Sequence, residues 1–151
     1  MERVSTAHLE TICSESNINN STSITVGRGE KRVEIEVKHR LNMDDVTKLV
    51  SEVCEGVFDT NKKVYRPELQ DFYLRKAVLE NYTNLDLPQN KECWELVYGT
   101  PVFAMVTGHD KRPVIFNGRE YDDNLVIDTD QYEQIISAIN MKISYILNHI
   151  G

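Results

Sequence analysis

Hydrophobic and polar positions alternate with two different periods along this chain. Between Ser23 and Val37 apolar residues occupy every second position on either side of Gly27–Glu30, which predicts a β-hairpin with one buried and one charged face. From Asn42 onward the apolar residues recur at steps of three and four, the spacing of amphipathic helices. The helices predicted in this part are Met43–Phe58, Arg66–Thr83, about Asn90–Tyr98 and a short turn at Val102–Val106.

Capping residues support these boundaries. Asn42 is a favourable N-cap, and Asp44 and Asp45 follow in the first turn, where the helix dipole stabilises acids. Pro67 is suited to the first position of the next helix, so Asp59–Arg66 is expected to be a loop. We expect Tyr73, Leu79 and Tyr82 of that central helix to form the core.

The two ends of the chain differ in character. Ser5 can cap a short helix over Thr6–Glu15, and the polar stretch Ser16–Ser23 is typical of a linker, so residues 1–22 are expected to form a flexible arm. Residues 23–151 are then expected to form one domain. Asn117-Gly118 predicts a small hairpin or loop within Gly108–Asp128, and Asp130 with Glu133 has capping-box spacing at the start of a long final helix.

These patterns predict an α+β fold. Its core would contain four to five helices centred on Arg66–Thr83, with the N-terminal hairpin on one side and the second hairpin or loop before the C-terminal helix. A length of 151 residues fits a single core.

Composition narrows the function classes. The net charge is −7, which argues against a duplex-DNA binder, because phosphate contacts need clustered Lys and Arg. No apolar run has the roughly 18 residues of a membrane helix, and the first residues lack the apolar stretch of a signal peptide. The three cysteines are far apart and odd in number, as expected in a reducing cytosol.

Candidate catalytic and cofactor motifs each have a simpler structural explanation. Gly27-Arg28-Gly29 lacks the third glycine of a dinucleotide fingerprint and is better explained as a tight turn. The four histidines lie in four elements without metal-ligand spacing. Acids between Asp122 and Asp130 fit turn and cap positions better than a calcium loop, and His109–Arg112 fits an exposed loop better than a catalytic site. We therefore expect no catalytic, metal-binding or cofactor-binding residue.

Charge is distributed unevenly along the chain. Residues 28–40 hold five basic and three acidic residues, a local balance of +2, whereas the remainder holds 12 basic and 21 acidic residues, a balance of −9. A basic hairpin could dock on the acidic body of a neighbouring copy; a solvated strand face with ordinary charge mixing explains the same pattern. The candidate inter-subunit contacts are Arg28, Lys31, Arg32, Lys38 and Arg40.

Three motifs carry a family resemblance: Val64–Phe72 (VYRPELQDF), Ala77–Asn84 (AVLENYTN) and Leu87-Pro88. They resemble small proteins encoded in the structural gene clusters of tailed phages and prophages of Gram-positive hosts. In that family a strand like Val33–Val37 precedes a helix like Met43–Phe58, and a long C-terminal helix closes the chain. The resemblance covers roughly residues 32–150 and carries no catalytic residue.

The resemblance implies a non-enzymatic virion protein, most plausibly a neck or head–tail connector subunit that assembles into a ring. Its partners would be further copies and neighbouring virion proteins, with no membrane, specific nucleic acid, cofactor or small-molecule substrate. It would reside in the virion, and in the host cytoplasm during assembly. Two alternatives remain: a tail-assembly chaperone or soluble inhibitor of a host defence protein, and a small hydrolase using His109.

Overall fold

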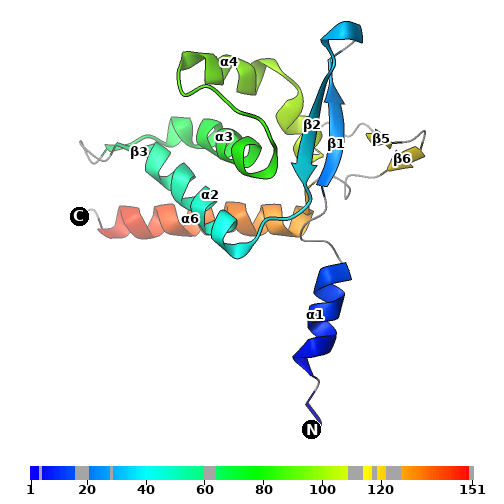
Figure 1. Cartoon of the computed structure of the whole chain (residues 1–151). Coiled ribbons are helices and arrows are strands. Elements are labelled where there is room, and N and C mark those ends of the chain that lie inside the picture. The colour runs from blue at the N-terminus through cyan, green and yellow to red at the C-terminus, as the bar shows by residue number, and fades with distance from the viewer. Residues whose placement is uncertain are drawn as a thin grey trace.

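The computed structural model describes residues 1–3, 5–15, 21–27, 29–59, 64–108, 114–116, 119–121 and 127–149. It confirms the α+β class: a helical body is flanked by a long two-stranded hairpin, and a small hairpin precedes the C-terminal helix (Figure 1). The helices are α1 (Thr6–Glu15), α2 (Met43–Val57), α3 (Gln70–Tyr82), α4 (Lys91–Gly99), α5 (Val102–Thr107) and α6 (Thr129–His149). The strands are β1 (Ser21–Val26), β2 (Val33–Lys38), β3 (Phe58–Asp59), β4 (Val64–Tyr65), β5 (Val114–Phe116) and β6 (Arg119–Tyr121).

The core lies where α2, α3 and α6 pack together. On α3, Leu79 and Tyr82 are fully buried as predicted, and Tyr73 packs against the core while half-buried. Gly56 of α2 permits this packing, because a Cβ there would overlap the Tyr73 ring. The predicted central position of α3 is therefore confirmed.

Two helices begin directly after an asparagine that caps them. Asn42 accepts the backbone N–H of Asp45 at the start of α2, and Asn90 accepts that of Glu92 at the start of α4. The long final helix buries Ile135, Ile139 and Ile143 as one stripe. Each of these three elements therefore follows from local capping chemistry and helical periodicity.

The long hairpin pairs β1 with β2 in antiparallel register, with Ile24 opposite Ile35 on the buried face. A bridge between Val37 and Thr83 joins β2 to the chain just after α3. Asn84 extends this join, since its side chain accepts the Glu36 N–H at 3.0 Å and its own N–H donates to the Glu36 carbonyl at 3.2 Å. Thr83 and Asn84, just after α3, therefore pair with β2 and anchor this end of the hairpin to the helical body.

A buried glutamine ties three elements together at this end of the hairpin. Gln131 of α6 is 6% exposed, and its Oε1 accepts the Leu41 N–H at 2.8 Å and the Tyr82 hydroxyl at 2.6 Å. Its Nε2 donates to the Leu41 carbonyl at 2.9 Å. Gln131 therefore satisfies both backbone groups of Leu41, in the segment between β2 and α2.

Four local predictions need correction. Asp59–Arg66 is not only a loop, because Phe58 pairs with Tyr65 and Asp59 with Val64 in a two-residue ladder. Pro67 opens a 3₁₀ turn, η2 (Pro67–Leu69), and the α-helix starts only at Gln70.

The other two corrections concern Ser21–Ser23 and the start of α6. Ser21–Ser23 belong to β1 rather than to a linker, and the Ser21 hydroxyl donates to the Glu36 carboxylate at 2.6 Å. The residue before α6 is Asp128, whose carboxylate accepts the Asp130 N–H, so Asp130 is not the cap.

The predicted second hairpin is also present. Val114, Ile115 and Phe116 of β5 pair with Tyr121, Glu120 and Arg119 of β6. Asn117-Gly118, His109–Pro113 and Asp122–Val126 lie outside the described residues.

Candidate interaction surfaces

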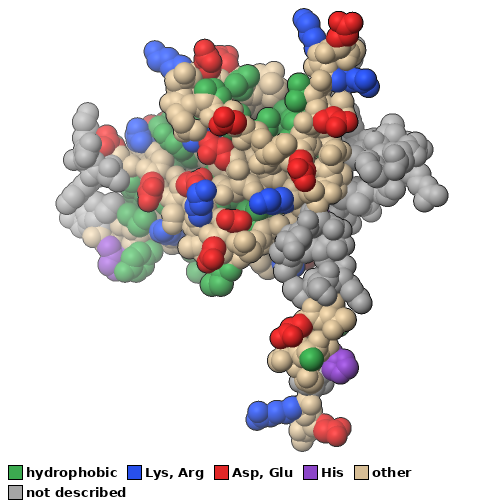
Figure 2. Space-filling view, viewed as in Figure 1, with side chains coloured by type: hydrophobic (Ala, Val, Ile, Leu, Met, Phe, Trp, Pro, Cys, Tyr) green, Lys and Arg blue, Asp and Glu red, His purple; other side chains and the backbone are tan. Residues whose placement is uncertain are grey.

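The tip of the β1–β2 hairpin projects beyond the helical body (Figures 1 and 2). Deeper in the hairpin Ile24 and Ile35 are buried, but Val33, on the same face and near the tip, is 55% exposed. The turn contains a short 3₁₀ helix, η1 (Gly29–Lys31), and Gly27 adopts a φ of 98°, which an L side chain rarely takes. The tip therefore presents an apolar side chain beside charged ones.

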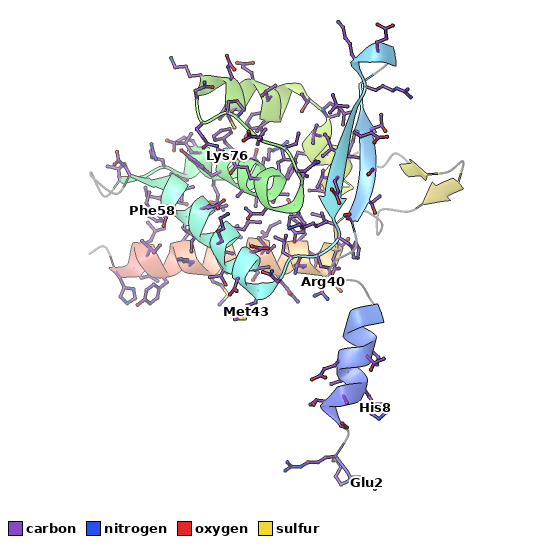
Figure 3. All side chains as sticks on the ribbon, in the orientation of Figure 1. Glu2, His8, Arg40, Met43, Phe58 and Lys76 are labelled. Atoms are coloured by element: carbon purple, nitrogen blue, oxygen red, sulfur yellow. The ribbon has the colours of Figure 1, made fainter. Side chains whose placement is uncertain are left out.

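The structure divides the predicted basic contacts into two groups. Lys31 and Arg32 are exposed at the tip, whereas Lys38 lies at the far end of β2, about 20 Å away along a strand of that length. Arg40 lies at the base, where its Nε is 3.0 Å from Asp128 Oδ2 (Figure 3). Arg28 lies outside the described residues. Only Lys31 and Arg32 are thus placed together on an outward surface.

An acidic hollow of about 430 Å³ lies between α2 and α3. Its acids are Glu52, Glu55 and Glu80, and its one lining cation, Lys76, is 2.8 Å from Glu80. The lining therefore carries a formal balance of −2. This is one place where the body could attract a basic element of another molecule.

An aromatic cluster lies on α3 and α4. Phe72 lies 5.1 Å from Trp94 and 6.4 Å from Tyr98 between ring centroids, and the Trp94 and Tyr98 rings are 4.6 Å apart. Trp94 and Tyr98 remain 44% and 39% exposed. Partly exposed aromatic rings held in fixed positions are typical of protein interfaces.

Charged groups fix the edge of this cluster. Arg75 lies 5.0 Å from the Tyr98 ring and 4.6 Å from the Phe103 ring, and its Nε donates to Asp71 at 2.8 Å. The Tyr98 hydroxyl donates to the same carboxylate at 2.7 Å. Partial burial, together with this hydrogen bond to Asp71, raises the pKa of Tyr98 to about 12. The hydroxyl therefore remains a neutral donor at physiological pH.

The sequence pattern predicts a helix at about Asn90–Tyr98 but does not single out this aromatic cluster. Cys93 and Val97 are buried four residues apart, and Trp94 and Tyr98 follow each of them by one residue. Two adjacent apolar stripes on a nine-residue helix are a signal for one buried and one outward face.

The two cysteines Cys54 and Cys93 are both buried. Burial raises the pKa of the Cys54 and Cys93 thiols, which favours unreactive neutral thiols. Within the described ranges, no three His, Cys, Asp or Glu side chains are grouped to hold a metal ion. His109 and the acids at 122 and 123 lie outside those ranges.

No family model, curated protein or solved structure matches this chain. None of the helices that the structure describes is both long and apolar enough to cross a bilayer.

Proposed function

We propose that this protein is a non-enzymatic structural subunit of a tailed-phage particle, a neck or head–tail connector protein that assembles into a ring. The motifs VYRPELQDF and AVLENYTN, which resemble phage structural proteins, support the phage assignment. The projecting hairpin tip carries the argument for assembly. Val33, Lys31 and Arg32 lie together there, outside the body.

The exposed side chains of the tip are of the kind that a second protein surface covers in an interface. An exposed valine at the end of an apolar strand face gains from being covered by another surface. The exposed charged residues of the turn, Glu30, Lys31 and Arg32, have a formal balance of +1, which favours an acidic surface, and the α2–α3 hollow with Glu52 and Glu55 is one of that sign. Where the tip of each copy contacts the body of the next in one direction, the contact is head to tail and can close into a ring, whereas a reciprocal contact between two copies would give a two-fold dimer.

The proposal is tested by reversing the charge of the tip. Lys31→Glu with Arg32→Glu should reduce the assembled fraction measured by light scattering. Raising the salt concentration should do the same to the parent protein, because exposed charges are screened over about 8–10 Å near physiological ionic strength. Lys91→Glu, an exposed lysine at the start of α4, is the matched control. Assembly that resists both treatments would exclude the hairpin tip as the contact.

The aromatic cluster favours a second candidate, a phage tail-assembly chaperone or an inhibitor of a host protein. Trp94 and Tyr98 form a hot-spot surface that a single copy could use against an unrelated partner. A chain that stays monomeric, and that loses partner binding in Trp94→Ala, would favour this function over the connector.

A further inference from the structure

The N-terminal helix α1 exposes apolar side chains. Leu9 and Ile12, one turn apart, are 62% and 59% exposed. Thr6 lies one turn before Leu9 and His8 one turn before Ile12, so no Lys, Arg, Asp or Glu lies directly beside these two apolar side chains on this face. Figures 1 and 3 show α1, with His8, well away from the helical body. An isolated helix of ten residues is marginal in water, so a partner surface would stabilise it considerably.

The outward face of α6 has a complementary character. This face is an open, shallow surface whose lining residues, from Glu133 to Asn148, all belong to α6, and we call it the α6 groove. Met141 and Tyr145 are 71% and 62% exposed along it, and Ile136 is half-buried at its other side. Apart from Glu133 at one end, the groove is lined only by uncharged side chains.

This absence of charge is unusual for the chain. Charged residues make up 27% of the sequence, yet none lines the groove between Ile136 and Asn148. Depletion of charge around exposed apolar side chains distinguishes the centre of a protein interface from ordinary surface. Ser137 and Ser144, two turns apart on this face, leave room for another helix to approach.

The dimensions of the two helices also agree. Ten residues of α1 measure about 15 Å, and the uncharged part of the groove, Ile136–Asn148, measures about 20 Å at the same rise per residue, which is long enough to hold α1. An amphipathic helix in an apolar groove, anchored by residues at three- and four-residue steps, is a recurring recognition mode.

We infer that α1 of one copy docks in the α6 groove of a second copy, with Leu9 and Ile12 beside Met141 and Tyr145. This inference rests on the proposed function, because it requires assembly, and it names a second contact of that assembly. Donation of a terminal helix to the next copy needs no other protein, and when each copy donates its helix in one direction the contact is again head to tail.

A photocrosslinking experiment on the full chain tests the inference. Benzoylphenylalanine replaces Ile12, and equal amounts of ¹⁵N-labelled and unlabelled protein are mixed, irradiated and digested. We expect cross-linked peptides that join residue 12 to the segment Ile136–Asn148, with one labelled and one unlabelled strand. Cross-links confined to a single chain would mean that α1 covers its own α6, which overturns the inference.

Matched variants give an independent readout by light scattering. Leu9→Asp with Ile12→Asp, or Met141→Asp alone, should weaken association at least about tenfold. Ala7→Asp with Thr11→Asp adds two acids to the opposite side of α1 and should leave association unchanged.

These results separate the two proposals. Normal assembly in the Leu9/Ile12 variant overturns the docking of α1 and leaves the connector proposal intact. A parent chain that does not assemble at any concentration overturns both.

Discussion

Leu79 shows how strongly the fold depends on one side chain of α3. It is 1% exposed in the centre of the core, so Leu79→Ala removes apolar contacts and leaves a cavity. We expect the free energy of unfolding to fall by about 2–5 kcal/mol. Leu96→Ala, at a leucine of α4 that is 44% exposed, is the control and should change it by less than about 0.5 kcal/mol in denaturant titrations. Equal effects at the two positions would refute the central placement of α3.

Gln131 is the polar residue with the largest expected effect. Gln131→Ala leaves the Leu41 N–H and carbonyl and the Tyr82 hydroxyl without their buried partner. We expect a loss of about 2–4 kcal/mol in the free energy of unfolding. Gln134→Ala, at an exposed glutamine of the same helix, should be near neutral. A near-neutral Gln131→Ala would mean that water replaces the side chain at no cost.

Tyr82 gives the fold a dependence on alkaline pH. Burial, and then the charge of Asp128, raise the pKa of its hydroxyl well above that of an unfolded tyrosine, about 10. Below pH 10 the residue is neutral in both states, so its contribution to stability is constant. Above pH 10 the unfolded state ionises first, and stability falls by up to about 1.4 kcal/mol per pH unit for this residue. Tyr82→Phe should flatten that fall in urea titrations at pH 9–11; an unchanged slope would contradict the burial of this hydroxyl.

At the scale of elements, local sequence predicted the structure wherever a short-range rule applies. The hairpin follows from apolar residues at every second position, and α2 from Asn42 and its helical stripe. The β3–β4 ladder has only two residues per strand, too few for any period to be visible. The role of Gln131 depends on Leu41, 90 residues earlier in the chain, so no local pattern indicates it.

The five basic residues proposed as inter-subunit contacts also show the difference between proximity in sequence and proximity in space. Charge counting grouped five basic residues because they are close in sequence. The geometry of an extended strand separates Lys31 and Arg32 from Lys38, and Arg40 is close to Asp128, which is remote in sequence. Net charge therefore points to the hairpin as a whole but not to which of its residues face outward.

The arm can be tested as an element. Deleting residues 1–15 removes α1 but keeps β1, which starts at Ser21 and pairs with β2. Because Leu9 and Ile12 are exposed, the thermal midpoint of the truncated chain at low concentration should stay within about 2 °C of the parent. Its tendency to assemble should fall. A drop of many degrees in the dilute truncated chain would show that α1 belongs to the core.

At the scale of the whole molecule, the surfaces lie on separate elements: the hairpin tip, the α2–α3 hollow, the outward face of α6 and α1. Contacts that pair two different surfaces extend from copy to copy, and a closed ring leaves none of them unpaired. In a ring each copy passes these contacts on in one direction, whereas a two-fold dimer would make them reciprocally, so the number of copies in the particle distinguishes the two.

The most direct test of the proposed assembly is the mass of the purified full-length chain across a range of concentrations, measured by light scattering with negative-stain imaging of the same fractions. The account predicts a discrete particle of many copies that appears as a ring and dissociates as salt rises. A monomer or two-fold dimer at every concentration and salt condition would contradict it.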